Sequence, residues 1–348
     1  MATDARKRSL WSRVPVVHQL QQSVGWQRGM LVAGLVICGI FLLTAAFAPW
    51  LAPYGFADLS DEAGVQFGAQ VPPGPGHPLG TTVGGYDVLS RVIWGAQTAL
   101  LVIVVAVLLS IFAGVVLGLV SGYLGGWSDR ALVVVADAVY AFPSLLLAIV
   151  MSIVISGGRS NLIGGILAAA ISITVVFIPQ YFRVTRSEVV RIKSEAFVES
   201  ARVIGTGTGR IMFRHVLRNS TRTLPLIFTL NASEAILTLA GLGFLGFGIE
   251  PTSAAEWGFD LNKSISDVTS GIWWTSVFPG LAIVLVVLGM TLVGESLNDL
   301  ADPRLRGRKA VTAAEAEAVG VTAVVPGGVP TTGPAGVFGL NAKEAAHE

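Results

Sequence analysis

Six long apolar segments constrain the fold of this chain more than any other feature of its sequence. Each is close to the roughly 20 apolar residues that a helix needs to cross a bilayer. The segments are Met30–Trp50, Ala96–Val120, Ala131–Ile155, Leu162–Phe182, Thr223–Gly246 and Ser276–Gly294. Only two charged residues, Asp137 and Glu234, fall inside them. Because lipid offers the backbone no hydrogen-bond partner, all six segments are predicted to be α-helices.

The composition places these segments in a membrane. Charged residues make up 13% of the 348 residues, hydrophobic residues make up 53%, and the mean hydropathy is +0.69. Soluble domains are about a quarter charged, so this chain has too few charges to cover a water-exposed surface. The balance argues against a cytosolic enzyme, a disordered scaffold and a nucleic-acid-binding protein. The single cysteine, Cys38, excludes an internal disulfide and a cysteine-rich metal site.

The basic residues lie almost entirely on one side of the predicted membrane. With the N-terminus in the cytoplasm, 20 of the 23 lysines and arginines fall in cytoplasmic segments. The other three are Arg91, Arg159 and Lys263. This asymmetry is the positive-inside pattern, and it predicts that both termini are cytoplasmic. The predicted fold class is therefore an all-α, multi-pass membrane protein of six helices.

The remaining sequence divides the chain into expected parts. A cytoplasmic tail covers residues 1–29, a first span 30–50 and a long outer loop 51–94. A membrane core covers 95–300, with spans at 96–120, 131–155, 162–182, 223–246 and 276–294, a cytoplasmic loop at 183–222 and an outer loop at 247–275. A second cytoplasmic tail covers 301–348. From residue 310 it is rich in Ala, Val, Gly, Pro and Thr, and we expect it to be disordered.

Two features inside the spans predict helix contacts. Gly114, Gly118 and Gly122 recur every four residues, which predicts a smooth ridge packed against another helix of the same chain. Asp137 lies near the cytoplasmic end of its span, shortly before Pro143, a residue that can kink a helix. We expect Asp137 to pair with an arginine of the cytoplasmic loop.

The 183–222 loop carries the strongest local pattern. It holds nine basic and three acidic residues, a charge that a cytoplasmic location alone would explain. Its pattern also predicts two short helices, Ser194–Ile204 and Arg210–Arg218, separated by a glycine-rich turn at 205–209. An element of this kind between two spans suits a cytoplasmic partner that presses on it.

The first of these short helices has a predicted cap and a predicted apolar face. Ser194 is the expected N-cap residue, and Phe197, Ala201 and Ile204 are expected to share the apolar face. The glycine run that follows is not a phosphate-binding loop, because the pattern G-x-x-x-x-G-K-[ST] occurs nowhere in the chain. The sequence therefore shows no means of hydrolysing ATP.

The loop resembles the EAA loop of ABC importer permeases. The residues that carry the resemblance are Glu199, Ser200, Ala201, Gly205, Arg214, His215, Leu217 and Arg218. Four further stretches are similar to the second permease subunit of the dipeptide/oligopeptide importer family. They are 47–54 (FAPWLAPY), 77–81 (HPLGT) with 87–91 (DVLSR), 244–248 (FLGFG) with Trp257 and Gly258, and 278–282 (FPGLA) with Asp299 and 302–305 (DPRL). The five stretches follow the expected order over about residues 30–306.

The resemblance implies a type I ABC importer transmembrane fold in the bacterial inner membrane, with the first span, 30–50, peripheral to the core. In this family the EAA loop, here residues 194–218, forms a coupling helix that seats in a groove of an ATPase subunit. Closure of the ATPases then alternates access through the spans. The implied partners are a second homologous permease subunit, two ATPase subunits or domains, an extracytoplasmic substrate-binding protein and membrane lipid, but no nucleic acid.

The resemblance also implies what this chain lacks and what stays open. The ATPase subunits bind ATP and magnesium, so we expect no catalytic residue, metal or cofactor in this non-catalytic subunit. The family carries dipeptides and oligopeptides, and some members carry glutathione, metal chelates or haem. The sequence departs from the family pattern at Thr82 and Tyr86, where Asp and Arg are usual, at Arg218, where Pro is usual, and at Leu239, where Glu is common.

Glu234 is the most informative single residue in the spans, because a carboxylate inside a membrane is costly unless solvated or paired. Asn231, Glu234 and Thr238 lie at i, i+3 and i+7 and are predicted to share one helix face. That face either lines a translocation path, where Glu234 meets a peptide amine, or forms a hydrogen-bonded contact between helices. The sequence leaves both open.

Two other classes of function fit less well. A transporter or channel acting alone usually shows internal repeats, and the sequence has none that we detect. An intramembrane enzyme would need paired carboxylates or a histidine in the spans, and the spans contain neither. We therefore expect a permease subunit of an ATP-driven importer.

Overall fold

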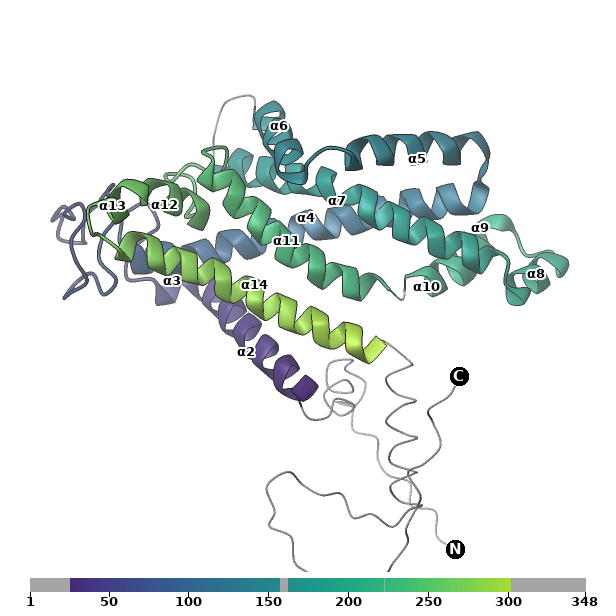
Figure 1. Ribbon diagram of the computed structural model, residues 1–348, viewed down its shortest axis with the longest axis horizontal. Coiled ribbons are helices and arrows are strands. Elements are labelled where there is room, and N and C mark those ends of the chain that lie inside the picture. The colour runs from purple at the N-terminus through teal and green to yellow at the C-terminus, as the bar shows by residue number, and fades with distance from the viewer. Residues whose placement is uncertain (1–25, 157–161, 222, 302–348) are drawn as a thin grey trace, which may run out of the picture. The chain divides into compact units, whose positions relative to one another are not determined.

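The apolar segments fold as helices (Figure 1), as a lipid environment requires. The computed structural model describes residues 26–156, 162–221 and 223–301. Within these ranges there is no β-strand, and only isolated β-bridges occur, all between residues 60 and 87. The chain divides into two units, Met1–Ala301 and Asp302–Glu348. The predicted disorder from residue 310 and the motif residues 302–305 lie outside the described residues.

Five described helices are long and apolar enough to cross a membrane, and a bent pair of helices adds a sixth crossing if the pair counts as one span. The five are α2 (Trp26–Ala46), α4 (Val88–Leu124), α7 (Leu162–Lys193), α11 (Leu224–Phe244) and α14 (Trp274–Ala301). The bent pair is α5 (Gly126–Tyr140) and α6 (Ser144–Ser156). The shorter helices are α3 (Ala48–Leu51), α8 (Ala196–Val203), α9 (Thr208–Arg210), α10 (Leu217–Ser220), α12 (Trp257–Lys263) and α13 (Ile265–Thr269).

Two spanning helices extend well past the predicted spans. α4 begins at Val88, because the Asp87 side chain caps its first turn by accepting a 2.8 Å hydrogen bond from the Ser90 amide. The last seven residues of the predicted outer loop, 88–94, are therefore helical. α7 continues to Lys193, so the first eleven residues of the predicted cytoplasmic loop are helical instead.

The third predicted span, Ala131–Ile155, is not one helix. α5 and α6 meet at an angle of 98° across residues 141–143. Pro143 lies in this break and cannot donate a backbone hydrogen bond to the turn before it. Pro179 and Pro279, in contrast, lie inside the continuous helices α7 and α14. A proline in a span thus permits a break, but the surrounding packing decides whether one forms.

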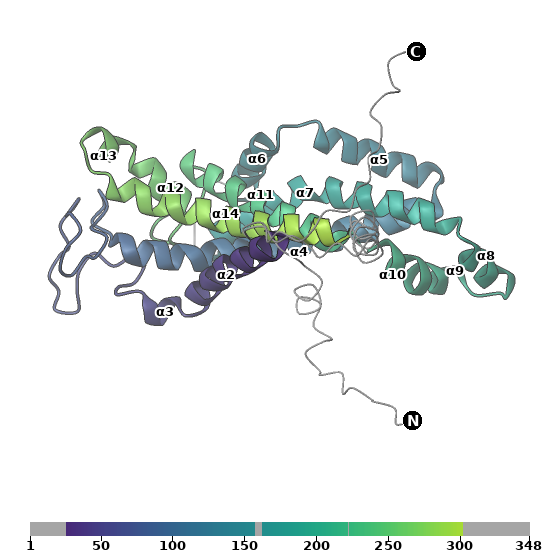
Figure 2. The ribbon, with the colours of Figure 1, turned by 60° about the horizontal axis from the view of Figure 1, so that its bottom comes forward.

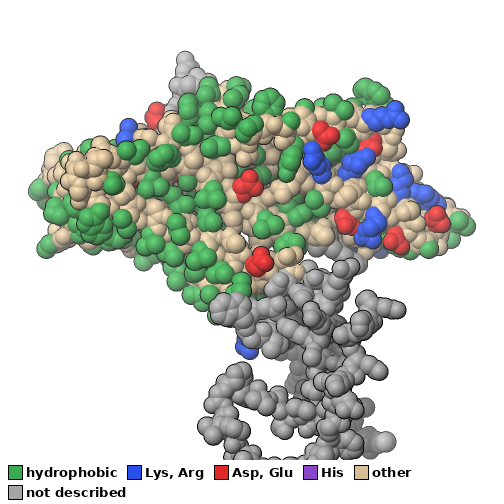
Figure 3. Space-filling model, viewed as in Figure 1, with side chains coloured by type: hydrophobic (Ala, Val, Ile, Leu, Met, Phe, Trp, Pro, Cys, Tyr) green, Lys and Arg blue, Asp and Glu red, His purple; other side chains and the backbone are tan. Residues whose placement is uncertain are grey.

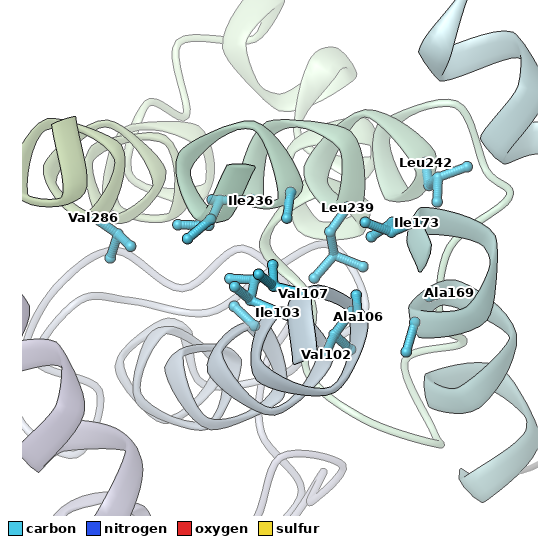
Figure 4. Packing of buried hydrophobic residues seen from close by; sticks show 14 of the residues in the cluster. Val102, Ile103, Ala106, Val107, Ala169, Ile173, Ile236, Leu239, Leu242 and Val286 are labelled. Atoms are coloured by element: carbon cyan, nitrogen blue, oxygen red, sulfur yellow. The ribbon is translucent and has the colours of Figure 1, made fainter. Parts of the chain in front are cut away.

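The core lies where α4, α7, α11 and α14 meet, and most of its members are small or β-branched (Figure 4). It includes Val102, Ile103, Ala106 and Val107 of α4, Ala169 and Ile173 of α7, Ile236, Leu239 and Leu242 of α11 and Val286 of α14. Side chains of this size let the helix backbones approach closely, which is how helices associate when lipid is as apolar as the side chains.

The predicted glycine ridge of α4 packs against α7. A Cβ atom added at Gly114 would collide with Cβ of Tyr181. One added at Gly118 would lie 2.7 Å from the Phe182 carbonyl oxygen, and one at Gly122 would lie 2.9 Å from that of Arg186. The prediction of close packing within the chain is confirmed.

The bundle has two chemically different ends (Figures 1 and 2). The cap, which we define as residues 51–87 together with 247–273, contains α12 and α13 and lies at one end. The other end contains α8, α9 and α10 and the C-terminal part of α7. Figure 3 shows lysine and arginine side chains gathered there among several acidic ones, with apolar side chains spread over much of the remaining visible face. This is the end that the positive-inside pattern predicts to be cytoplasmic.

Candidate functional site

The predicted coupling segment forms a helical hairpin at the basic end. α8 ends at Val203, and Gly205, with a φ of 79°, reverses the chain. Only glycine adopts this backbone conformation readily. The returning arm joins α9, a π-helical segment η2 (Ile211–Val216) and α10 into one helical stretch. The prediction of two helices around a glycine turn is confirmed for this part of the chain.

The predicted N-cap residue of the first short helix, Ser194, is wrong. The N-cap residue of α8 is Glu195, and its side chain makes no capping hydrogen bond. Ser194 instead donates its hydroxyl proton to the Arg191 carbonyl oxygen at 2.9 Å. The helix therefore starts two residues later than predicted, because Ser194 hydrogen-bonds back to the end of α7.

The buried face of α8 also differs from the prediction. Val198, which is fully buried, and Ala201 point inward, whereas Phe197 and Ile204 are exposed. The inward residues belong to a small core with residues of α4, α7 and η2. Its other members are Leu119, Tyr123, Val189, Ile192, Ile211 and Val216. The hairpin is thus anchored to the spanning helices α4 and α7 by its own apolar contacts.

The exposed face of the hairpin is apolar at its tip. We call Phe197, Val203, Ile204 and Phe213 the tip patch. The exposed fractions of these side chains are 44%, 87%, 80% and 57%. Several exposed apolar side chains on an element that projects from the bundle favour a protein-binding role for that element.

The other residues that carry the family resemblance surround this patch. Glu199, Ser200, Arg214 and Arg218 are exposed, His215 and Leu217 are half-buried, and Gly205 forms the turn. Ser200 donates a 2.9 Å hydrogen bond to the Ala196 carbonyl oxygen within the same helix. Arg218, at the position where proline is usual, is accommodated in α10 without a break in the helix.

A charged contact that the sequence did not predict fixes the base of the hairpin. Arg186 of α7 binds Asp129 of α5 through Nε at 2.6 Å and Nη2 at 2.8 Å. Asp129 also accepts a hydrogen bond from Ser121. Lys193, the last residue of α7, donates to the Tyr123 carbonyl oxygen at 2.8 Å. α4, α5 and α7 are thus joined directly beside α8.

The three predicted pathway residues do not share one environment. Asn231 and Thr238 are buried, with exposed fractions of 1% and 6%, whereas Glu234 is exposed. Leu230 and Leu237 flank Glu234 on the exposed strip of α11. The i, i+3 and i+7 spacing keeps the three residues on one side of α11, but Glu234 lies at the edge of that side, where the helix is exposed.

Glu234 lines a cavity of about 240 Å³ beside the break between α5 and α6. Tyr140, Ser144 and Gln180 also line it. Among the described residues, the Glu234 carboxylate has neither a hydrogen-bond nor an ion-pair partner, although the Glu234 carbonyl oxygen accepts a hydrogen bond from Thr238. Next to the cavity, Asp137 binds Nη2 of Arg183 at 2.7 Å, and the guanidinium lies 4.4 Å from the centre of the Tyr140 ring. The expected pairing of Asp137 with an arginine is confirmed.

At the opposite end, Arg91 near the start of α4 joins the two halves of the cap through a buried ion pair and a hydrogen bond. Nε of Arg91 lies 2.7 Å and 2.9 Å from the carboxylate oxygens of Asp260, and the two residues are only 1% and 9% exposed. Nη1 of Arg91 donates to the Phe56 carbonyl oxygen at 3.0 Å. The guanidinium also lies 5.0 Å from the centre of the Tyr86 ring. The pair links residues separated by 169 positions, which no local pattern could reveal.

Glu256 is the second buried acid of the cap. Its carboxylate accepts hydrogen bonds from the amides of Gly258 and Phe259 at 2.8 Å and 2.7 Å and so caps α12. Burial raises the pKa of Glu256 to about 8, although these two hydrogen bonds oppose the shift. Burial also raises the pKa of Asp260, against the effect of Arg91.

Glu256 and α12 fit closely against glycines. These glycines belong to the end of α11 and to the FLGFG and WG stretches. A Cβ atom at Gly243 would collide with Oε2 of Glu256, and one at Gly258 would collide with the Ala240 carbonyl oxygen. The indole of Trp257 donates to the Val92 carbonyl oxygen at 3.1 Å. These sequence stretches therefore hold α12 against α4 and α11.

The remaining departures from the family pattern have structural contexts. Thr82 and Tyr86 both line a cavity of the cap. Leu239, 2% exposed, is part of the main core. Among the described residues, no group of three or more histidine, cysteine, aspartate or glutamate side chains could hold a metal ion.

Two family models match this chain. Residues 114–307 match the model described as "Binding-protein-dependent transport system inner membrane component". Residues 27–72 match the model described as "N-terminal TM domain of oligopeptide transport permease C". The first match covers the coupling segment and five of the six crossings in whole or in part, and the second covers α2, α3 and the start of the cap.

Individual relatives match over most of their length. The dipeptide transport system permease protein DppC of Alkalihalophilus pseudofirmus is 36% identical over 277 residues, which cover 80% of this chain and 86% of the relative. The glutathione transport system permease protein GsiD of Pectobacterium atrosepticum is 31% identical over 311 residues, or 86% of this chain and 98% of the relative. GsiD of Escherichia coli O157:H7 is 33% identical over 310 residues, or 87% and 98%.

Proposed function

Because this chain belongs to the family of binding-protein-dependent transport system inner membrane components, we propose that it imports dipeptides or oligopeptides as one permease subunit of an ATP-driven complex. A second homologous permease supplies the other half of the pathway. Two ATPase subunits or domains bind ATP and magnesium, so this chain is itself non-catalytic. A substrate-binding protein delivers the ligand from outside.

The observation that carries the coupling role is the tip patch on its anchored hairpin. Val203 and Ile204 are among the most exposed apolar side chains described. The same hairpin buries Val198 against α4 and α7. A groove on an ATPase subunit that covers Val203 and Ile204 would gain about 1.5–3 kcal/mol for each buried side chain. Motion of the ATPase would pass through Val198 and its neighbours into α7.

The pathway role rests on Glu234. The exposed strip of α11 that carries Glu234 faces lipid, water or another subunit. Placing an ionised carboxylate in lipid costs several kcal/mol. A water-filled path along the second permease removes this cost. The carboxylate would then bind the amino group of a passing peptide, with Gln180 and Ser144 as neighbouring polar groups in the cavity.

The coupling role is tested by replacing the two most exposed residues of the tip patch. The double variant Val203→Ser/Ile204→Ser should lower the affinity of the permease for its ATPase subunits at least tenfold, since the two side chains together are worth about 3–6 kcal/mol. ATPase subunits retained after affinity purification of the permease give the measurement. Val65→Ser, in the cap and likewise apolar and exposed, is the matched control. Full retention by the double variant would contradict the coupling role.

The substrate is tested by uptake. Proteoliposomes containing the complete complex should take up a labelled dipeptide, and Glu234→Gln should raise the concentration needed for half-maximal uptake. One relative is named as a glutathione permease, so competition by glutathione is measured in parallel. Haem and metal chelates are the further alternatives within the same fold. Transport by this chain alone would instead identify a secondary transporter.

A further inference from the structure

The cap contains a cavity of about 200 Å³ that the proposed function does not use. It lies between residues 82–86, Pro251 and the helices α12 and α13, with Thr275 at the start of α14. Its walls include the rings of Tyr86 and Phe259 and the side chain of Val83. It belongs to the end of the bundle opposite the basic hairpin, which is the outer end by the positive-inside pattern.

A buried carboxylate lines this cavity. Asp267 is 1% exposed, and its Oδ1 accepts a 2.6 Å hydrogen bond from Nε2 of Gln70. Among the described residues, nothing donates to its Oδ2. An ionised carboxylate that leaves one oxygen buried and unpaired is unfavourable. The cavity therefore presents an acceptor that a positively charged donor would stabilise.

The basic side chains in and beside the cap do not fill this position. Arg91 is committed to Asp260, which also lines the cavity. Lys263 lines the cavity too, but its side chain is exposed and its Nζ lies 5.3 Å from the centre of the Phe259 ring. It makes no ion pair with either aspartate in the described part of the chain. Of the two carboxylates that line the cavity, Asp260 thus has a buried cation and Asp267 does not.

We propose that this cavity receives a lysine or arginine side chain of the extracytoplasmic substrate-binding protein, with its cationic group at Asp267. The apolar walls suit the aliphatic stem of such a side chain, while the head binds the carboxylate. The volume fits one long side chain and is below the range of about 300–1,000 Å³ usual for ligand sites. The cavity also lies in the cap, away from the spans that would carry a peptide.

This inference rests on the proposed function, because it presumes a binding protein, and its test separates the two. The complete complex in nanodiscs is titrated with the binding protein that co-purifies with it, and stimulated ATP hydrolysis is measured at several salt concentrations. Asp267→Asn should raise the half-saturating concentration about tenfold, the factor that one charge-assisted hydrogen bond supplies. It should also weaken the salt dependence, since one ion pair is lost.

Three further variants serve as controls. Glu62→Gln removes one exposed charge from the same cap and should leave the half-saturating concentration unchanged. Gln70→Asn shortens the donor to Asp267, and asparagine tolerates the φ of 57° at this position. Lys263→Ala removes the lysine that lines the cavity.

Each outcome supports or overturns the inference. A rise with Asp267→Asn alone supports it. An unchanged half-saturating concentration for Asp267→Asn overturns it. An equal rise of the half-saturating concentration with Gln70→Asn would show that Asp267 only holds the cap together. An equal rise with Lys263→Ala would show that the chain's own lysine is the partner of Asp267. Either result overturns the inference. Absence of any stimulation in the unaltered complex would overturn the proposed function itself.

Discussion

Removing either partner of the Arg91–Asp260 pair should destabilise the cap strongly. Both side chains are at least nine-tenths buried and make two short hydrogen bonds to each other. Loss of one partner leaves a buried, uncompensated charge, at a cost of about 3–5 kcal/mol. Arg91→Met would leave Asp260 close to Glu256. Asp260→Leu would leave Arg91 with a carbonyl oxygen and an aromatic ring as its main neighbours.

The double variant Arg91→Met/Asp260→Leu should cost much less than the sum of the single variants. Both charges are then absent, and apolar side chains occupy their volume, a replacement that is often nearly neutral. We therefore expect a coupling free energy of at least about 2 kcal/mol. This is well above the additivity error of roughly 0.3–0.5 kcal/mol for independent sites.

Thermal unfolding of the purified permease, followed by tryptophan fluorescence, measures these effects. Trp94 and Trp257 hydrogen-bond to backbone carbonyl groups next to the pair and so report on the cap. With roughly 2 °C for each kcal/mol, each single variant should lower the midpoint by about 6–10 °C. Arg191→Met, which breaks the exposed pair with Glu188, should shift it by less than about 1 °C. Additive effects of the single variants would refute the argument.

Two further predictions concern the neighbours of this pair. Burial raises the pKa of Glu256 in the folded state to about 8, so the folded state binds the carboxyl proton more tightly than the unfolded state does. The free energy of unfolding should therefore fall as the pH rises from about 5 to about 8. Glu256→Gln should flatten that part of the curve of unfolding midpoint against pH. Gly258→Ala should lower the midpoint by several degrees, since its Cβ would collide with the Ala240 backbone, whereas Gly207→Ala, where an added Cβ meets nothing within 4 Å, should change it little.

The spans could be predicted from the sequence because lipid leaves the backbone one solution. In lipid, the length of an apolar segment alone identifies a helix. The glycine spacing in α4 also predicts which face of that helix packs closely against another. The break at 141–143 could not be predicted in the same way. Pro143, Pro179 and Pro279 all lie in apolar segments, yet only the first separates two helices. The difference comes from packing between helices, which the local sequence does not contain.

The candidate site was predictable in outline but not in its orientation. The glycine turn and the two arms of the hairpin follow from local propensity. The buried face of α8 does not, since a helix of eight residues has too few turns for its apolar periodicity to decide between Phe197 and Val198. Val189 and Ile192 at the end of α7 decide it together with Leu119 and Tyr123 of α4, which come from a distant part of the chain. The ion pair between Arg91 and Asp260 likewise joins residues that are distant in the sequence.

The unbroken length of α7 has a mechanical consequence. A helix of 32 residues is about 48 Å long, whereas the hydrocarbon core of a bilayer is about 30 Å thick. α7 is therefore long enough to project beyond the lipid, and the glycine ridge of α4 packs against it between Ile178 and Val189. A rotation of about 5° at the hairpin end corresponds to a displacement of about 4 Å over this length. Small movements at one surface of the membrane thus become side-chain-sized movements at the other.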